Sequence, residues 1–347
     1  KLFKLKPYSL NEKKKNILFK KYLNFLNSYH YRNNKNYRKI IQTFYNDKIQ
    51  YKEFDKMPFI STPIFKEIDL KSIKESNILK EMNSSGTSGK SLSKIYLDKI
   101  NASNQVKTLK NIVQSEIGDK RLPMLIVDSD PREYKKKYSK INARLAAING
   151  FSIFGKNHTY ILKTNMEINF EKLLNFLKLN GNKPFLIFGF TSLIYEFFVK
   201  KLNNTLSNNA LKNGIIIHGG GWKKLENMNI SNKKFNEILR KKTGVDNIIN
   251  YYGLVEQTGS IFMECKKCKN FITSNFSKII IRTKELKPQK DNSIGLIQLF
   301  SLIPTSYAGH ILLTEDEGKI VKRGKCKYCK QKKELDLKFL VELKWLN

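Results

Sequence analysis

Short apolar runs that alternate with segments of helical pattern constrain the fold of this chain more than any other feature. The runs occupy residues 122–128, 183–190, 214–218 and 248–252. Their length and the turn residues that flank them predict buried strands. Helices are expected between them, over residues 143–148, 170–179, 191–202 and 235–243. Strands that alternate with helices predict an α/β fold, with a large core of mixed sheets flanked by helices.

The two ends of the chain depart from this central pattern. Residues 9–46 have apolar residues at helical spacing and predict two helices around a break near residues 30–36. The inward face of these helices is expected to contain Ile17, Leu18, Tyr22, Leu23, Phe25 and Leu26. After Cys265, short strands and turns predict a small β-rich C-terminal part. We therefore expect a helical N-terminal segment, an α/β core and a β-rich part, over residues 1–60, 61–262 and 263–347.

The chain is strongly basic, with 65 Lys and Arg against 30 Asp and Glu and a formal net charge of +35 in 347 residues. Such an excess is typical of proteins that bind nucleic acid or anionic membranes. It also follows from a composition biased toward Lys, Asn and Ile. The first 60 residues have a surplus of 11 positive charges, but later segments are basic too, and no stripe of Arg alternates with aromatic residues. We favour the compositional explanation, place a peripheral membrane contact or an acidic partner second, and disfavour nucleic acid.

The sequence indicates a soluble cytoplasmic protein. No run approaches the ~20 apolar residues that cross a bilayer, and the first residues lack the apolar block of a signal peptide. Four cysteines in two close pairs suit a reducing compartment and argue against a disulfide framework.

The first candidate binding site is the stretch N-S-S-G-T-S-G-K-S at residues 83–91. Its glycines let successive N–H groups converge, and its lysine supplies the positive charge that a polyphosphate needs. It is not a Walker loop, because Ser84 stands where that motif requires its first glycine and a strand-like segment follows. A flexible polar loop is the simpler alternative. We favour a phosphate-binding loop between two strands, made of Ser84, Ser85, Gly86, Thr87, Ser88, Gly89 and Lys90.

Two further motifs follow strands of the predicted sheet. Three glycines come directly after the strand at 214–218, at the carboxyl edge where α/β folds bind ligands, although a tight turn is equally compatible with them. These glycines are Gly219, Gly220 and Gly221. In the second motif Tyr252, Gly253 and Glu256 leave the next strand. An aromatic ring and an acid in one short turn can stack a base and hold a divalent ion, whereas the alternative for Glu256 is a solvated loop carboxylate.

Four strings in this sequence together resemble the acyl-protein synthetase family of the adenylate-forming superfamily. They read S-S-G-T-S-G, H-G-G-G-W-K, Y-G-L-V-E-Q and G-H-I-L-L-T-E-D, in that order along the chain. The best-known members of this family are the fatty-acid-activating subunits of bacterial luciferase operons. The resemblance implies a large adenylate-forming-type domain and a ligase that uses ATP and Mg²⁺.

The resemblance also implies roles for individual residues. The loop from Ser84 to Lys90 would surround the β- and γ-phosphates of ATP, with Lys90 as a catalytic residue. Gly219 to Gly221 would line the adenine, Tyr252 would stack on it beside Gly253, and Glu256 would hold Mg²⁺. Asp316 matches the acid that binds the ribose hydroxyls, and Arg323 is a looser match to an arginine that contacts ribose or phosphate. Val255 departs from the superfamily pattern, which has threonine there, and no motif identifies the usual C-terminal catalytic lysine.

The expected reaction is ATP-dependent activation of a carboxylic acid, with a fatty acid favoured, to an acyl-adenylate, followed by transfer to a thiol of a protein. An acid–CoA ligase, or an acyl-transfer enzyme of a glycan or secondary-metabolite pathway, is the alternative within this chemistry. A basic zinc-knuckle protein that binds nucleic acid is the alternative of another class. The aromatic-rich segment 185–198 could border the acyl chain, but we favour plain core for it.

The four cysteines form two C-x-x-C pairs, Cys265 with Cys268 and Cys326 with Cys329. Two such pairs are the ligand set of a tetrahedral zinc site, which is the interpretation we favour. The family resemblance provides a second interpretation, in which Cys326 or Cys329 carries the acyl group as a thioester. Four ordinary reduced thiols are the third. Zinc and acyl transfer exclude each other at one cysteine, because a thiolate bound in a closed metal site cannot attack.

Overall fold

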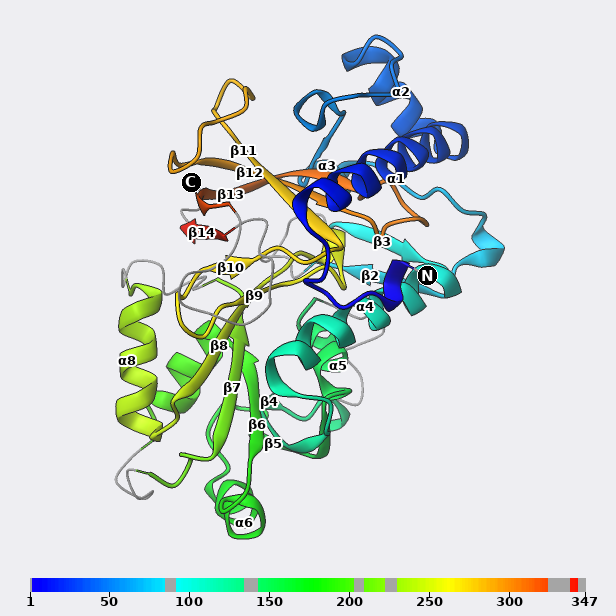
Figure 1. Cartoon of the computed structure of the whole chain (residues 1–347). Helices are drawn as coiled ribbons and strands as arrows, with labels where there is room; N and C mark the ends of the chain where they lie inside the picture. Colours follow the sequence, from blue (N-terminus) through cyan, green and yellow to red (C-terminus); the bar gives the residue numbers. More distant parts are fainter. Residues whose placement is uncertain are drawn as a thin grey trace. The chain divides into compact units, whose positions relative to one another are not determined.

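The computed structural model describes residues 2–84, 92–133, 143–202, 209–221, 230–323 and 338–342. The chain forms two compact units, both discontinuous in sequence (Figure 1). We call the first the terminal unit, because it contains both chain ends and comprises Lys1–Ser115, Lys140–Ala143 and Gly253–Asn347. The second, here the central unit, comprises Glu116–Ser139 and Arg144–Tyr252.

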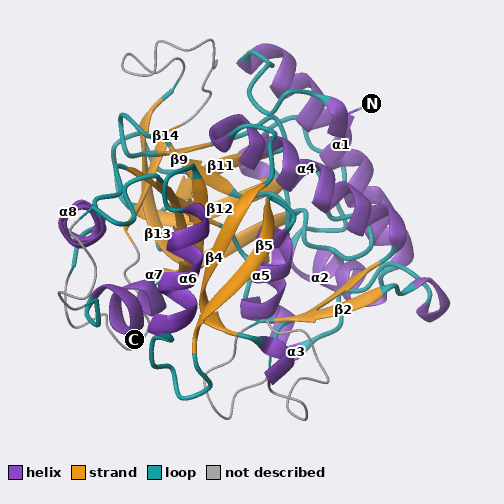
Figure 2. Ribbon diagram, turned by 90° about the horizontal axis from the view of Figure 1, so that it is seen from below, coloured by secondary structure: helices purple, strands orange, loops and turns teal. Residues whose placement is uncertain are grey.

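The central unit has a parallel sheet in the order β8-β7-β6-β4-β5, which confirms the predicted α/β core (Figure 1 and Figure 2). Its strands are β4 (Leu122–Ser129), β5 (Gly155–Leu162), β6 (Phe185–Phe190), β7 (Gly214–Gly219) and β8 (Asn247–Tyr252). The helices are α5 (Ala143–Ser152), α6 (Phe170–Asn180), α7 (Thr191–Leu193), the π-helix η5 (Ile194–Val199) and α8 (Asn232–Thr243). The 3-10 turn η4 (Pro131–Glu133) follows β4.

The strands β4, β6, β7 and β8 are largely buried on both faces, which explains their continuous apolar runs, whereas β5 has three exposed residues after Gly155. Side chains on one face, including Phe185 and Ile216, pack with Phe176 of α6 and Phe198 of η5. On the other face Phe188 stacks on Phe151 of α5, with ring centroids 4.5 Å apart. Phe185 and Phe198 are fully buried, as expected for plain core.

The terminal unit has a largely antiparallel sheet in the order β11-β12-β13-β14-β10-β9, with β1 parallel to β13. Its strands are β1 (Ile60–Ser61), β9 (Phe262–Glu264), β10 (Phe271–Ile272), β11 (Ser277–Arg282), β12 (Gly295–Ser301), β13 (Ile311–Lys322) and β14 (Lys338–Glu342). A separate antiparallel hairpin joins β2 (Lys80–Asn83) to β3 (Lys94–Leu97). The strands after Cys265 confirm the β-rich character predicted for this part of the sequence.

The helices of the terminal unit are α1 (Glu12–Asn33), α2 (Lys35–Phe44), α3 (Ile64–Glu67) and α4 (Lys99–Ile117). Its 3-10 turns are η1 (Leu2–Lys4), η2 (Phe54–Lys56), η3 (Glu75–Asn77) and η7 (Val255–Gln257). The predicted break between the first two helices falls at Asn34. Its N–H donates to the carbonyl of His30 at 2.8 Å, and its side chain accepts from the N–H of Tyr37, so this residue ends one helix and caps the next.

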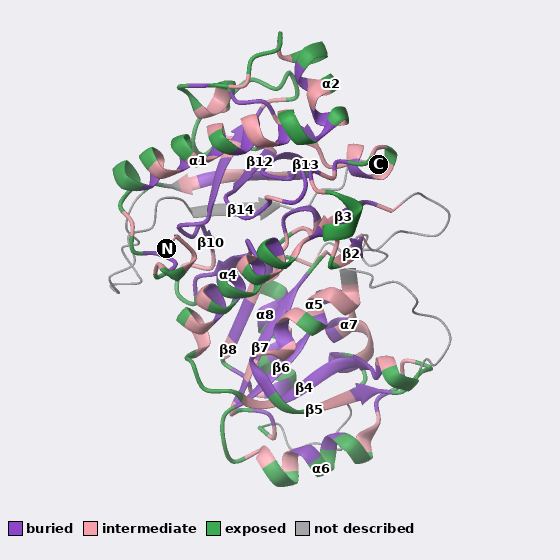
Figure 3. Ribbon diagram, turned by 90° about the vertical axis from the view of Figure 1, so that its right-hand side faces the viewer, coloured by how far each residue is buried: buried purple, intermediate pink, exposed green. Residues whose placement is uncertain are grey.

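The predicted inward face of α1 is wrong for two residues. Ile17 is 63% exposed and Phe25 is 55% exposed, although both have helical apolar spacing. The buried stripe consists of Phe19, Leu23 and Leu26, which pack against Phe300, Leu302 and Ile311 of the terminal unit. Exposed residues therefore occupy the outer side of α1 (Figure 3). None of the helices in the described ranges is long and apolar enough to cross a membrane.

Candidate functional site

Glu256 lies in the short turn η7 and is 7% exposed. Burial raises the pKa of its carboxyl above the ordinary value, and the nearby charge of Asp316 raises it further. The Ser93 hydroxyl and the charge of Lys66 act in the opposite direction and lower this pKa. Glu256, Asp316 and Ser93 are buried and Lys66 is half-buried, and we call these four residues of the terminal unit, which act together on the Glu256 carboxyl, the Glu256 cluster.

The donor set of the Glu256 cluster suits Mg²⁺ held together with a phosphate group. Magnesium in nucleotide-dependent enzymes is bound by one or two carboxylates, with waters and substrate phosphates completing the octahedron. Two buried carboxylates, those of Glu256 and Asp316, lie within range of each other's charge. The described part of the chain has no group of three or more His, Cys, Asp or Glu side chains that would hold a metal unaided. The cluster thus has too few protein ligands to hold a metal by itself. Phosphate oxygens of a bound polyphosphate would supply further ligands.

The hairpin β2–β3 brings the base of the predicted phosphate loop to this cluster. The N–H of Ser84 donates to the carbonyl of Ser93, and the N–H of Ser93 donates to Ser84 Oγ, both at 3.0 Å. The β3 strand contacts η7, so the loop leaves and re-enters the fold beside Glu256. The hydroxyl of Ser93 makes no hydrogen bond of normal geometry to any described residue, although it lies close enough to influence Glu256. The loop residues Ser85, Gly86, Thr87, Ser88, Gly89 and Lys90 lie outside the described residues.

A segment near β13 supports the backbone of η7. The hydroxyl of Tyr307 donates to the carbonyl of Glu256 at 2.8 Å, and Gln257 Nε2 donates to the carbonyl of Gly309 at 2.8 Å. A Cβ at Gly309 would lie 2.7 Å from the carbonyl oxygen of Glu256, so glycine is required for this approach. Tyr307 and Gly309 therefore hold the turn that carries the carboxylate.

Asp316 and Arg323 both belong to the region of β13 but have different surroundings. Asp316 is 5% exposed, and its N–H donates to Thr314 Oγ1 at 3.2 Å, while that hydroxyl donates to the carbonyl of Ile297 at 2.9 Å. Arg323 donates from Nε and one terminal nitrogen to the two carboxylate oxygens of Asp291, both at 2.7 Å. This pairing with Asp291 raises the pKa of Arg323. Asp316 thus lies in the Glu256 cluster, while Arg323 is engaged with a half-exposed partner.

The glycines predicted to line the adenine lie at the carboxyl end of β7 in the central unit. A Cβ at Gly219 would lie 2.6 Å from Cδ1 of Tyr251, so its absence allows that ring to pack on the backbone. Gly220 has φ of +77°, a left-handed conformation that favours glycine, and Gly221 follows it. The ring of Tyr251 also stacks near Phe188 with centroids 6.3 Å apart. The aromatic ring against Gly219 is therefore that of Tyr251, while Gly220 lies against the ring of Phe190.

Tyr252 and Gly253 end β8 and begin the segment that leads to η7. Tyr252 is 8% exposed, like Tyr251 before it. A Cβ at Gly253 would lie 3.0 Å from Cγ2 of Ile261, which leaves little room for a side chain. A glycine here lets the chain turn closely past Ile261.

Cys265 and Cys268 lie in the turn between β9 and β10, the first buried and the second partly buried. The N–H of Cys265 donates to the carbonyl of Asn270 at 2.8 Å, and the N–H of Lys269 donates to the carbonyl of Cys265 at 2.9 Å. Lys269 has φ of +57°. This tight turn places both thiols on one short hairpin. The other two cysteines, Cys326 and Cys329, precede β14 and lie outside the described residues.

The sequence analysis did not select three residues of the Glu256 cluster and its support, namely Lys66, Ser93 and Tyr307. Lys66 belongs to the short helix α3, and Tyr307 belongs to an irregular segment before β13. Ser93 lies two positions after the glycine- and serine-rich stretch, so its position near that stretch could have indicated it. Lys66 and Tyr307 reach Glu256 only through the tertiary fold.

The chain is similar to known proteins over most of its length. The model of a family described as acyl-protein synthetase, LuxE, matches residues 1–340. Two similar curated proteins are both named long-chain-fatty-acid–luciferin-component ligase. That of Vibrio harveyi is 25% identical over 305 residues, which cover 84% of this chain and 76% of that protein. That of Aliivibrio fischeri is 24% identical over 301 residues, with the same coverage of 84% and 76%.

The fold is similar to that of a solved adenylate-forming ligase. An open conformation of 2-hydroxyisobutyryl-CoA ligase, in complex with 2-HIB-AMP and CoA, has a TM-score of 0.71 at 10% identity. The match covers 95% of this chain and 75% of that chain. This likeness confirms the predicted class of fold.

Proposed function

The chain belongs to the acyl-protein synthetase (LuxE) family, and we propose that it activates a long-chain fatty acid with ATP and transfers the acyl group to a thiol of a partner protein. It is an adenylate-forming ligase of the acid–thiol type. The two curated relatives are named for joining a long-chain fatty acid to a luciferin component, and this is the basis for the proposed fatty-acid substrate.

The observation that carries the proposal is the Glu256 cluster at the base of the predicted phosphate loop. Buried carboxylates are costly without a compensating cation. Here the charge of Lys66 lowers the pKa of Glu256, which nevertheless stays raised by burial. The cluster therefore fits a bound Mg²⁺, which would be held by Glu256 and would neutralise the phosphates of ATP.

The first half-reaction that we propose is the formation of an acyl-adenylate. A carboxylate oxygen of the acid attacks the α-phosphorus of ATP, a new O–P bond forms, and the bond to the bridging oxygen breaks to release pyrophosphate. The products are the acyl-adenylate and pyrophosphate, so charge and atoms balance. Ser84 to Lys90 would bind the leaving phosphates and Asp316 would bind the ribose. In the central unit, Gly219 to Gly221 and Tyr252 are proposed to hold the adenine, while Arg323 would reach the nucleotide only after release from Asp291.

The second half-reaction transfers the acyl group. A thiolate attacks the acyl carbonyl, the C–S bond forms, and the bond to the adenylate oxygen breaks with loss of AMP. The relatives' names indicate a protein as the acceptor. The acyl-adenylate is a good electrophile because AMP is a stable leaving group.

The test is fatty-acid-dependent exchange of radioactive pyrophosphate into ATP, measured over acids from acetate to palmitate. We expect exchange to peak at a long chain length and to require Mg²⁺. Glu256→Gln should reduce exchange by on the order of 10³-fold, because the cation loses its carboxylate. Glu315→Gln is the matched control, since Glu315 is an exposed carboxylate beside Asp316 on the same strand. Full exchange in the Glu256→Gln variant would refute the assignment of this site.

The paired cysteines are the subject of a separate proposal, that they bind Zn²⁺ as a tetrahedral structural site. The β9–β10 turn presents Cys265 and Cys268 on one hairpin. The β10 strand pairs with β14, so the segment that carries Cys326 and Cys329 leads into a strand next to this hairpin. A Cys₄ set is thus compatible with the strand order.

Metal analysis distinguishes zinc from the acyl-carrier interpretation. Zinc predicts about one metal ion per chain, lost in Cys265→Ser and in Cys329→Ser alike. An acyl carrier predicts no metal and labelling of Cys326 or Cys329 by radioactive fatty acid, with Cys265→Ser still labelled. If neither metal nor label is found, the cysteines are ordinary reduced thiols.

A further inference from the structure

The outward side of α1 has a chemical character that the proposed catalytic site does not use. Five basic side chains and two large apolar ones are solvent-exposed along this helix. They are Lys13, Lys14, Lys20, Lys21, Arg32, Ile17 and Phe25. We call this set the basic face of α1. We propose that this face binds the surface of an anionic lipid bilayer.

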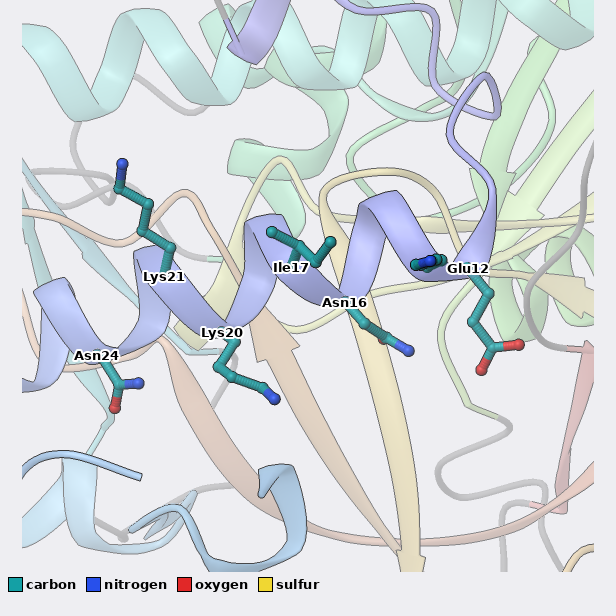
Figure 4. A pocket seen from close by; sticks show the side chains of 7 residues that line it. Glu12, Asn16, Ile17, Lys20, Lys21 and Asn24 are labelled. Atoms are coloured by element: carbon teal, nitrogen blue, oxygen red, sulfur yellow. The ribbon is translucent and has the colours of Figure 1, made fainter. Parts of the chain in front are cut away.

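The spacing of these residues distributes them over the outward half of the helix surface, away from the buried Phe19 and Leu23. Lys14, Ile17, Lys21 and Phe25 are three or four positions apart, so they lie next to one another along the helix surface. Figure 4 shows Ile17 and Lys21 on one side of the helix axis and Asn16, Lys20 and Asn24 on the other, over a hollow bordered by this helix. On the opposite side of α1, Phe19 and Leu23 are buried against the rest of the terminal unit. The basic face of α1 therefore points to solvent.

The charge on this face is almost wholly positive. Within α1 the only acidic residue is Glu12, at its first position, where it also lies near Arg323. Lys15 is not part of the face, because it is buried and its Nζ donates to Thr273 Oγ1 at 3.4 Å. An anionic surface is complementary in charge to such a row of lysines. Each basic side chain near an anionic bilayer strengthens binding about fivefold.

The apolar residues on the face favour lipid over an acidic protein or nucleic acid. Ile17 is 63% exposed and Phe25 is 55% exposed. The ring centroid of Phe25 lies 6.1 Å from that of Tyr29 and 5.8 Å from that of Tyr22. Basic clusters on a helix bind anionic headgroups, and exposed apolar side chains next to them add buried apolar area at the bilayer surface. Long lysine side chains can hold their charge at the headgroups while apolar neighbours enter the acyl boundary.

The test is flotation of the full chain with vesicles of phosphatidylcholine alone and with vesicles in which about a third of the lipid is phosphatidylglycerol. We expect binding only to the anionic vesicles, with weakening by salt. The triple variant Lys13→Gln, Lys20→Gln, Lys21→Gln should bind on the order of 100-fold more weakly. Ile17→Gln with Phe25→Gln should weaken binding without changing net charge.

The matched control removes three exposed lysines from another helix. Lys233→Gln, Lys241→Gln and Lys242→Gln in α8 change the net charge equally, and all three are exposed. Equal loss of binding in both triple variants would show that total charge is responsible and would overturn the proposal. Binding of poly-glutamate, but not of vesicles, with the same lysine dependence would assign the face to an acidic protein and would also overturn it. Circular dichroism of each variant shows that the fold is intact.

This proposal is independent of the catalytic one. Pyrophosphate exchange with a short, water-soluble acid and no vesicles should be unchanged in the α1 triple variant, since none of its residues belongs to the Glu256 cluster. Failure of exchange in the wild type would refute the catalytic proposal alone. Failure of vesicle binding would refute the lipid proposal alone.

Discussion

The hydroxyl of Tyr307 donates a hydrogen bond of 2.8 Å to the main-chain carbonyl of Glu256, across 51 positions of sequence. The ring of Tyr307 is buried and meets that of Phe65 edge-on, with centroids 6.3 Å apart. Burial raises the pKa of Tyr307, so its hydroxyl remains a donor at physiological pH. This hydrogen bond fixes the turn from which the Glu256 carboxylate projects.

Tyr307→Phe should therefore weaken the magnesium site while leaving the fold intact. Loss of one buried hydrogen bond costs about 1 kcal/mol of folding free energy. The Mg²⁺ concentration for half-maximal exchange should rise about threefold to tenfold as η7 relaxes. Tyr45→Phe is the control, because its hydroxyl donates to the carbonyl of Phe59 at 3.1 Å in the same unit. A similar stability loss in both variants, with no change in Mg²⁺ dependence, would contradict the positioning role of Tyr307.

Ser84→Ala tests the base of the phosphate loop. The variant removes the oxygen that accepts from the N–H of Ser93 at 3.0 Å, while the other rung of the hairpin remains. We expect KM for ATP to rise about threefold to tenfold, with a smaller change in kcat, because the loop ends separate. Ser115→Ala in α4 removes a comparable hydroxyl, one that donates to the carbonyl of Ile112 at 2.7 Å. An unchanged KM for ATP in Ser84→Ala would argue against a phosphate-binding role.

Glu256→Gln should stabilise the protein in the absence of nucleotide and metal. Burial raises the pKa of Glu256, so the folded state binds this proton more tightly than the unfolded state does. Wild-type stability therefore decreases as pH rises from the ordinary glutamate range through the raised value. The stability gained by Glu256→Gln should increase over the same range and then become constant. Urea denaturation at several pH values measures it, with Glu315→Gln at an exposed carboxylate of the same strand as the control. A destabilised Glu256→Gln variant at pH 8 would contradict this account.

Four strands of the central sheet could be predicted from sequence because they are largely buried on both faces, whereas β5 is partly exposed and has no such apolar run. The run of β6 from Phe185 to Phe190 is apolar throughout, so its length and flanks were sufficient. The outer face of α1 could not be predicted in the same way. Ile17 and Phe25 satisfy the helical period as well as Leu23 does, and only the docking of the helix on Phe300 and Ile311 decides which side is buried.

The candidate site was predictable only in part. Glu256 and Asp316 belong to recognisable strings, so the two carboxylates could be chosen from sequence. The influence of Lys66 on Glu256 could not be predicted from sequence, because the two residues are 190 positions apart and the terminal unit is assembled from both ends of the chain. The aromatic contact of Gly219 involves Tyr251, the immediate neighbour of the tyrosine in the motif, because adjacent residues of a strand point to opposite faces.

A buried pair of neutral histidines should make the terminal unit sensitive to acid. His30 and His310 have ring centroids 4.7 Å apart, and both are almost fully buried. His30 Nε2 donates to the carbonyl of Pro304 at 3.2 Å, and its Nδ1 accepts from Ser72 Oγ at 2.8 Å. Burial lowers the pKa of His30 to about 3, and burial and the charge of His30 lower the pKa of His310 well below the usual 6.5.

Between pH 6.5 and about 3 the unfolded chain should bind protons at these histidines that the folded chain excludes. Stability therefore falls as pH falls, by up to about 1.4 kcal/mol per pH unit for each histidine. The slope of unfolding free energy against pH, measured in urea from pH 7 to pH 5, should be reduced in His30→Gln and in His310→Gln even if both variants are less stable. The variant His158→Gln, which replaces an exposed histidine, is the control. Identical slopes in all four proteins would mean that other groups, such as the carboxylates, account for the acid sensitivity.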